Sequence, residues 1–212
     1  MIIIGAKGFA KEVLEILHQN NQLEGLAFYD DVNHDLPDLL YNQFPILKNE
    51  KQVKEHFQKH GNDFTIGIGG PKLRELMFEK FSKLGGSFKS TISSTSYIGN
   101  YENHIDDGCN IMQNVVLTND ITLKKGVLIN QMSSIGHDVI IGKFSEICPS
   151  VSISGNCKIG DYVFIGTGVI ILPKITIGNN VMIGAGAVVN KDLPDNCVAV
   201  GIPAKIIKIN ND

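Results

Sequence analysis

The sequence predicts a two-part chain, in which a small α/β unit is followed by a parallel β-helix. The first observation is a six-residue repeat of aliphatic residues that runs without a break from Ile105 to Val189. The second is that residues 1–88 lack this repeat and alternate short apolar runs with amphipathic stretches. The third is that glycine-rich or acidic turns follow those apolar runs directly. These observations predict two domains, residues 1–88 and residues 89–212, the second ending in a short polar tail.

The repeat fixes two inward positions in every six residues. The first is always aliphatic, at Ile105, Ile111, Leu117, Leu123, Ile129, Ile135, Ile141, Ile147, Ile153, Ile159, Ile165, Ile171, Ile177, Ile183 and Val189. The second comes four residues later and is small or aliphatic throughout. A helix period of 3.6 cannot hold this phase, and three hexapeptides make one triangular coil, so we expect five coils. Ile98 is one residue out of phase and is assigned to the first coil. Glycine directly after an inward residue, as at Gly136, suits a tight corner.

Residues 1–88 are interpreted as alternating strands and helices. We expect strands at 2–4, 26–29 and 64–68, helices at 9–19, 50–60 and 71–84, and an irregular piece around Pro37 and Pro45. This alternation predicts a small parallel sheet of Rossmann-like layout. Ligands of such sheets gather at the carboxyl ends of the strands, which here are 5–8, 30–31 and 67–71. A glycine turn at a helix start offers amide groups to phosphate, so a nucleotide fits. The alternative is that the glycines only let the chain turn, and the incomplete glycine fingerprint argues against bound NAD.

Composition limits the partners. The net charge of −3 does not indicate the basic surface that would bind nucleic acid or an anionic membrane. No apolar run is long enough to span a bilayer. No basic segment followed by an apolar one starts the sequence, so we expect a cytoplasmic protein with reduced cysteines. His104 and His137 are the two histidines in the repeat, too few for a three-histidine zinc site, and we expect no metal.

His137 is the candidate base. It occupies an outward position of the repeat, Asp138 follows it, and Asn130 precedes it by seven residues. Gly155 comes eighteen residues later, hence one coil above in the same column. A carboxylate can orient an imidazole and raise its basicity, and a bare backbone amide about 5 Å away could hold a carbonyl oxygen. The spacing therefore suits acyl transfer, although an outward histidine can also be an ordinary surface residue.

Several segments together resemble one family. They are GAKGFAKEV at 5–13, Asp30-Asp31, LINQMSSIGHD at 128–138, Ser154-Gly155-Asn156, IGTG at 165–168 and GIPAK at 201–205. The chain resembles the sugar acyltransferases of the sialic-acid O-acetyltransferase (NeuD) and bacillosamine-pathway (PglD) family. The resemblance covers nearly the whole chain and implies that the β-helix is left-handed. It also implies acetyl-CoA as co-substrate with no bound cofactor, and a homotrimer with the acyl donor in the groove between neighbouring prisms.

The resemblance implies roles by position. His137 and Asp138 would be catalytic, the first as general base and the second tuning it. The acetyl-CoA contacts implied are Asn130, Glu146, Gly155, Thr167 and Lys205. Those implied for the nucleotide-sugar are Lys7, Gly8, Phe9, Asp30, Asp31 and Gly69. Two positions depart from the family, which commonly has histidine in place of Phe9 and of Glu146.

The predicted function is N-acetylation of a UDP-linked amino sugar by direct transfer, since no cysteine or serine is placed beside a base. O-acetylation of a sugar hydroxyl is the near alternative. A non-catalytic nucleotide-sugar-binding trimer and, with the weakest support, a nicotinamide enzyme are the others.

Overall fold

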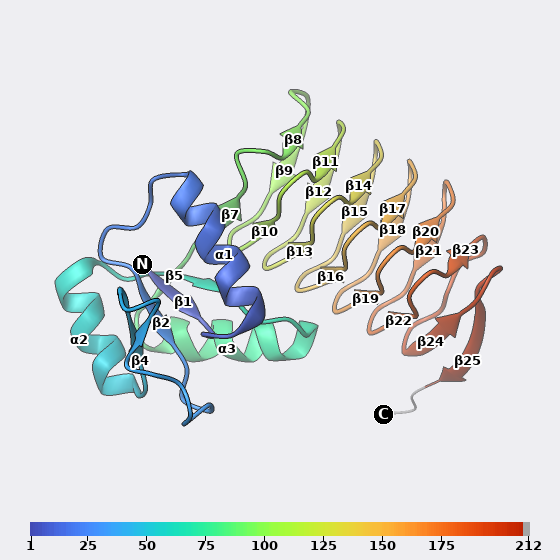
Figure 1. Ribbon diagram of the computed structural model, residues 1–212. Coiled ribbons are helices and arrows are strands. Elements are labelled where there is room, and N and C mark those ends of the chain that lie inside the picture. The colour runs from blue at the N-terminus through green and yellow to red at the C-terminus, as the bar shows by residue number, and fades with distance from the viewer. Residues whose placement is uncertain (210–212) are drawn as a thin grey trace.

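A computed structural model describes residues 1–209, and Figure 1 shows an α/β unit beside a column of stacked coils. The α/β unit has one six-stranded sheet of order β3-β4-β2-β1-β5-β6. Its strands are β1 (Ile2–Ile4), β2 (Ala27–Tyr29), β3 (Leu39–Leu40), β4 (Phe44–Leu47), β5 (Asp63–Ile66) and β6 (Ser87–Phe88). Its helices are α1 (Gly8–Gln19), α2 (Glu50–His60) and α3 (Pro71–Lys83). Every pairing in this sheet is parallel except that of β3 with β4.

The sheet is buried on both faces, and its two central strands, β1 and β2, are apolar at every position. Ile3 and Phe28 pack with the apolar side of α1, while Ile4 and Phe64 pack on the other face with Phe81 of α3. Such continuous apolar runs are typical of parallel strands covered on two sides.

The segment around Pro37 and Pro45 was expected to be irregular, and this expectation is wrong. It forms the β3–β4 hairpin, and β4 then pairs in parallel with β2. Pro45 is tolerated because the pairing of β4 with β2 begins at Ile46, so the missing amide hydrogen of Pro45 falls outside that ladder.

The column consists of two-residue strands at six-residue intervals. They are β7 (Thr91–Ile92), β8 (Tyr97–Ile98), β9 (His104–Ile105), β10 (Asn110–Ile111), β11 (Val116–Leu117), β12 (Thr122–Leu123), β13 (Leu128–Ile129), β14 (Ser134–Ile135), β15 (Ile140–Ile141), β16 (Glu146–Ile147), β17 (Ser152–Ile153), β18 (Lys158–Ile159), β19 (Phe164–Ile165), β20 (Ile170–Ile171), β21 (Thr176–Ile177), β22 (Met182–Ile183) and β23 (Val188–Val189). Fifteen of these strands, β9 to β23, end on a residue of the predicted repeat. The structure is a left-handed parallel β-helix, as expected.

Three sheets form the walls of the column. We call the wall that contacts the α/β unit the docking sheet, and it holds β7, β10, β13, β16, β19 and β22. The second sheet holds every third strand from β8 to β23, and the third sheet holds every third strand from β9 to β21. We call the turns between the second and third sheets the His137 corner, and those between the docking and second sheets the Asn130 corner. Neighbouring coils pair at eighteen residues, as in Leu117 with Ile135, but at nineteen in Tyr97 with Val116. The first coil therefore carries one extra residue, which explains the phase slip at Ile98.

Both predicted inward positions are buried along the column, with Ile105 packed against the same cluster. Glycines after the inward residues serve a different purpose from the one expected. Gly136 has no left-handed backbone, but an added Cβ would lie 2.7 Å from the amide nitrogen of Gly155 in the next coil. The left-handed residue falls two positions later in each turn, as at Asp138 (φ 58°). Gly136 is therefore needed because it lets the next coil approach closely, and not because of its own backbone conformation.

The C-terminal segment adds two strands. β24 (Cys197–Val200) continues the docking sheet in parallel, and β25 (Lys205–Ile209) pairs with it antiparallel. A short polar tail was expected after Lys205, and for residues 206–209 this is wrong because they belong to β25, which is held by backbone pairing. Residues 210–212 of the predicted tail lie outside the described residues.

Within residues 1–209, no helix is both long enough and apolar enough to cross a membrane.

His56 of α2 makes the fold sensitive to acid. Burial lowers the pKa of His56 to about 4, helped by the charged N-terminus and His60, and its Nε2 has no partner within residues 1–209. The folded-state pKa lies below the ordinary value of about 6.5, so the stabilisation is complete above pH 6.5 and is lost as the pH falls toward 4. Because His56 is only half-buried, we expect the loss of folding free energy to be about 1 kcal/mol. The midpoint of thermal unfolding should differ less between pH 7 and pH 4 in His56→Asn than in wild type. His34 is exposed, so His34→Asn should show the same difference as wild type.

Candidate active site

The His137 corner holds a histidine–carboxylate pair. Nδ1 of His137 lies 2.6 Å from Oδ2 of Asp138, and both side chains are more than half exposed. The left-handed backbone of Asp138 turns its carboxylate back onto the preceding ring. With Nδ1 held by the carboxylate as the N–H tautomer, Nε2 keeps its lone pair and can accept a proton.

Gly155 lies directly against this ring. An added Cβ at Gly155 would be 2.6 Å from Nε2 of His137, so a side chain there would displace the imidazole. The amide N–H of Gly155 donates to no acceptor within residues 1–209, while the next amide, Asn156, donates to the carbonyl of His137. The corner thus brings together a base and a free backbone donor, as the eighteen-residue spacing predicts.

Asn130 and Thr167 do not share this corner. Both lie in turns of the Asn130 corner, at the other edge of the second sheet, where Asn130 is buried and donates through Nδ2 to the carbonyl of Ile147 at 3.1 Å. Thr167 is exposed two coils above. Lys205 begins β25 at the C-terminal end of the column and is also exposed. Within one chain, Gly155 therefore lies at one edge of the second sheet, Asn130 and Thr167 lie at the other, and Lys205 lies at the end of the column.

The turn before α1 is open to an anion. Lys7 is the N-cap residue but supplies no side-chain cap, and the first turn of α1 holds no acidic residue. Gly8 is exposed, and its missing Cβ leaves free space. Lys7 also reaches the loop after β2, where its Nζ lies 3.6 Å from Oδ1 of Asp35. Uncapped helix amides beside a lysine suit a phosphate group.

Phe9 has a packing role. It lies against Ile16 of α1 and against Met112 and Leu128 of the β-helix. The aromatic ring therefore helps to join the two units at a position where the family commonly carries histidine.

The two aspartates after β2 have different surroundings. Asp30 is buried and accepts hydrogen bonds from Asn33, whose Nδ2 lies 2.9 Å from Oδ2, so it holds its own turn. Oδ2 of Asp31 accepts from Lys80 of α3 and from the hydroxyl of Tyr29, both at 2.7 Å. Burial alone would raise the pKa of Asp31, but these hydrogen bonds lower it below its ordinary value. Both aspartates line the carboxyl edge of the sheet with most of their acceptor capacity in use.

Glu146 and Gly69 meet where the two units join. Oε2 of Glu146 accepts from the amide of Gly70 at 2.6 Å, and an added Cβ at Gly69 would lie 3.1 Å from Oε1. Glu146 points outward from the docking sheet, on a different wall from His137. The structure therefore places this predicted acetyl-CoA contact beside a predicted nucleotide-sugar contact.

Arg74 is a residue that the sequence did not reveal, because an arginine in an amphipathic helix usually lies on the surface. Here it is fully buried in α3. Its guanidinium donates to the carbonyl of Ile68 at 2.9 Å and to Oδ1 of Asn110 at 2.6 Å, with longer contacts to the carbonyls of Ile66 and Gly126. Burial lowers the pKa of Arg74 to about 10, and the charge of Glu146 opposes that shift. Arg74 fixes the loop before α3 to the β-helix.

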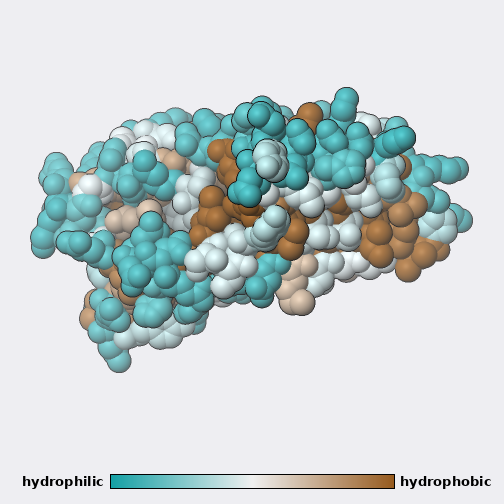
Figure 2. All heavy atoms as spheres, turned by 90° about the horizontal axis from the view of Figure 1, so that it is seen from above, coloured by the Kyte–Doolittle hydropathy of each residue, from teal (hydrophilic) through white to brown (hydrophobic). Residues whose placement is uncertain are grey.

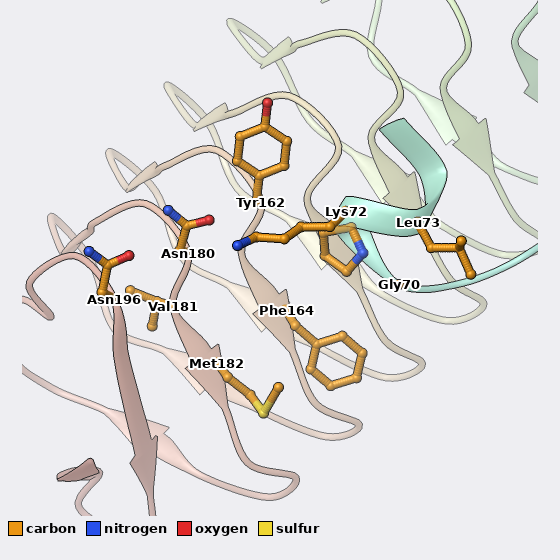
Figure 3. A pocket seen from close by; sticks show the side chains of 10 residues that line it. Gly70, Lys72, Leu73, Tyr162, Phe164, Asn180, Val181, Met182 and Asn196 are labelled. Atoms are coloured by element: carbon orange, nitrogen blue, oxygen red, sulfur yellow. The ribbon is translucent and has the colours of Figure 1, made fainter. Parts of the chain in front are cut away.

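A cavity of about 340 Å³ opens next to this junction. It is lined by the start of α3 and the outer face of the docking sheet, at Gly70, Pro71, Lys72, Leu73, Tyr162, Phe164, Asn180, Val181, Met182 and Asn196. Figure 3 shows Lys72 extending from α3 over the strands, with Phe164 and Met182 below it and Asn180 and Asn196 in a row at the corner. The combination of an apolar floor, a cation and amides suits a ligand with both an apolar and an anionic part.

Comparisons with known proteins found matches to two parts of the chain. Residues 1–81 match the PglD N-terminal domain, and residues 156–191 match the bacterial transferase hexapeptide repeats. The galactoside O-acetyltransferase of Escherichia coli K12 is 35% identical over 199 residues, which cover 90% of this chain and 80% of that protein. This chain belongs to the NeuD/PglD-like family of sugar acyltransferases. Members are acetyl-CoA-dependent sugar acetyltransferases, and this chain is one, with acetyl-CoA as its co-substrate.

Two solved structures of NeuD/PglD-like proteins match the whole architecture. A variant of perosamine N-acetyltransferase from Caulobacter crescentus, in complex with CoA and GDP-perosamine, is 26% identical, with a TM-score of 0.89 over 100% of this chain and 96% of that one. The acetyltransferase domain of PglB from Neisseria gonorrhoeae FA1090, in complex with acetyl coenzyme A, is 29% identical, with a TM-score of 0.88 over 97% and 98%.

Proposed function

We propose that the protein transfers the acetyl group of acetyl-CoA to the amino group of a nucleotide-linked amino sugar, with His137 as the general base. The observation that carries this proposal is the His137–Asp138 pair lying against Gly155 with its unused amide. Nε2 takes the proton of the attacking amine, and the amide of Gly155 holds the thioester oxygen as negative charge develops on it.

Direct transfer is supported by the state of the cysteines. Cys148 lies in a turn of the Asn130 corner, and burial raises its pKa to about 12. A thiol that stays protonated is a poor nucleophile, and the three other cysteines are also buried. The acetyl group therefore passes from CoA to the sugar within one ternary complex.

The second sheet is the surface through which we expect three chains to associate. Its outward residues carry no charge, namely Tyr97, Val116, Ser134, Ser152, Ile170 and Val188. The third sheet instead presents His104 and Lys158 among its outward residues. Figure 2 shows two apolar areas on this side of the molecule, one in the middle and one toward the end of the column formed by the last coils. An uncharged wall of small and apolar side chains is suited to burial between identical chains.

Trimer formation through this wall would also complete the active site. If three second sheets face a common three-fold axis, the His137 corner of one chain meets the Asn130 corner of the next. His137 and Gly155 of one subunit then share a groove with Asn130 and Thr167 of its neighbour. The two sets of predicted contacts that one chain keeps apart are united in this arrangement.

A matched pair of isoleucines tests the trimer. Ile170 on the second sheet and Ile140 on the third are both outward, at 43% and 42% exposure. Ile170→Glu places three carboxylates around the axis, and we expect the trimer to dissociate and the turnover number, kcat, to fall at least about tenfold, because each buried like charge costs several kcal/mol. Ile140→Glu should leave both unchanged. Sedimentation velocity of each variant measures the mass. A trimeric Ile170→Glu protein would show that another wall makes the contact.

The nucleotide-sugar is proposed to bind at the carboxyl edge of the α/β sheet, with its phosphates between Lys7 and the starts of α1 and α3. We expect the nucleotide to be UDP. The assay is release of free thiol from acetyl-CoA in the presence of UDP-, GDP- and dTDP-linked amino sugars. Turnover with UDP-linked sugars above the others supports the proposal, and a preference for GDP-linked sugars would correct the nucleotide.

O-acetylation is the second candidate, because the 35% identical relative is named a galactoside O-acetyltransferase. The two products differ in chemistry, since hydroxylamine cleaves an acetyl ester and leaves an acetamide intact. A radiolabelled product that resists hydroxylamine supports the amine as acceptor. Release of the label would assign the reaction to a hydroxyl.

A further inference from the structure

Glu146 lies between the part of the docking sheet that α1 covers and the part that lines the cavity. On the docking sheet its neighbours in the adjacent coils are Leu128 on one side and Phe164 on the other. Leu128 is covered by α1, whereas Phe164 lines the 340 Å³ cavity. Glu146 itself is only 8% exposed, because the loop before α3 lies on it. Glu146 therefore lies beside the cavity, next to Phe164 and Gly70, which line it.

One of the two carboxylate oxygens of Glu146 accepts no hydrogen bond from residues 1–209. Oε2 accepts the amide of Gly70, but Oε1 accepts no hydrogen bond from residues 1–209. No lysine, arginine or histidine within the described residues lies at ion-pair distance from Glu146, and the two terminal nitrogens of Arg74 donate to carbonyls and to Asn110. Within residues 1–209, the buried side-chain nitrogen or oxygen atoms that lack a partner are Nε2 of His56 and Nε of Arg74, so Oε1 of Glu146 keeps contact with solvent and can accept from a ligand.

Gly69 keeps the free oxygen accessible. An added Cβ at Gly69 would lie 3.1 Å from Oε1 and 3.3 Å from Oε2 of Glu146. The backbone of Gly69 is not in the left-handed region, so the glycine is not required for its own conformation. What its missing side chain provides is an approach to the carboxylate from the carboxyl edge of the α/β sheet.

The chemistry of Glu146 selects between the two substrates. A carboxylate only accepts hydrogen bonds, and the carbonyl oxygen of a thioester is also only an acceptor, so Glu146 cannot hold the acetyl group as a histidine could. An amino sugar, in contrast, offers an ammonium group at neutral pH, which makes charge-assisted hydrogen bonds with carboxylates.

We propose that Oε1 of Glu146 binds the amino group of the acceptor sugar and makes Glu146 the residue that selects an amine over a hydroxyl. This inference rests on the proposed amino-sugar acetylation and moves Glu146 from the donor to the acceptor. The bound ammonium releases one proton to water before it attacks. The nitrogen lone pair then forms the N–C bond as the C–S bond breaks, and His137 of a neighbouring copy carries the second proton from nitrogen to the departing thiolate.

The test uses the full-length protein and two variants. Glu146→Gln keeps an oxygen for the amide of Gly70 but loses the charge, and Gly69→Ala covers the carboxylate without changing it. Calorimetry gives the Kd of a UDP-linked amino sugar and of its hydroxyl counterpart. We expect the wild type to prefer the amino sugar by about tenfold or more, and each variant to lose most of that preference, because hydrogen bonds to charged groups have this strength. Glu79→Gln, an exposed acid on α3, is the control and should keep it.

Kinetics then separate the outcomes. The KM for the amino sugar should rise about tenfold in Glu146→Gln, with the KM for acetyl-CoA within about twofold of wild type. An unchanged preference in both variants, or a rise confined to the KM for acetyl-CoA, would overturn the inference while the acetylation itself stands. A wild type that acetylates hydroxyl sugars and no amino sugar would overturn the proposed function. Thermal unfolding of each variant checks that the fold is retained.

Discussion

Replacement of His137 by alanine is expected to lower kcat by about 10²–10⁴-fold, the usual contribution of a positioned general base. The reason is local, because the ring is held by Asp138 and lies against the free amide of Gly155. The side chain is 62% exposed, so its removal leaves no buried cavity, and the midpoint of thermal unfolding, Tm, should change little. Thiol release from acetyl-CoA at saturating sugar measures kcat.

The other histidine of the β-helix is the matched control. His104 also points outward, 69% exposed, but from the third sheet, with Glu102 as its nearest carboxylate at 3.8 Å. His104→Ala should therefore retain wild-type turnover. Equal activity of His137→Ala and wild type would remove the base assignment, even if acetyl-CoA still binds.

Replacement of Arg74 by alanine is expected to cost about 3–5 kcal/mol of folding free energy. The substitution removes the guanidinium donors to the carbonyls of Ile66, Ile68 and Gly126 and to Asn110, and three of these four hydrogen bonds are buried. For a chain of this length, that corresponds to a fall in Tm of about 10 °C. Because Ile68 precedes the Gly69 loop, the KM for the nucleotide-sugar should rise as well.

Two further variants identify the cause of the lost folding free energy. Arg74→Met restores most of the volume but none of the donors, so most of the destabilisation should remain. Lys83→Ala, at the exposed end of the same helix, should shift Tm by no more than a degree or two. If Arg74→Met were as stable as wild type, the hydrogen bonds of Arg74 would have no net value.

The β-helix was predictable from the sequence because each of its turns imposes the same constraint. A residue such as Ile135 faces inward in every coil, so its position in the repeat specifies both its burial and its neighbour in the next coil. The stacking of Gly155 on His137 follows from the same eighteen-residue spacing and is confirmed by the contact between them.

The junction between the two units was not predictable, because it depends on contacts between residues far apart in the chain. Nothing near Arg74 in the sequence indicates that Asn110 will accept from it, and Glu146 reads as an outward residue of a solvent-exposed strand. The β3–β4 hairpin was missed for a related reason, since β3 has two residues and the four residues of β4 include a proline, which leaves almost no local pattern.

The antiparallel strand β25 has a consequence for self-association beyond the trimer. Parallel coils present open backbone groups at the end of a stack, where another chain could add itself and extend the column into a fibre. On the docking sheet this growing end is closed, because β25 pairs with β24 in the opposite direction and interrupts the parallel pattern. The hairpin thereby acts as a terminator that limits the column to a finite length.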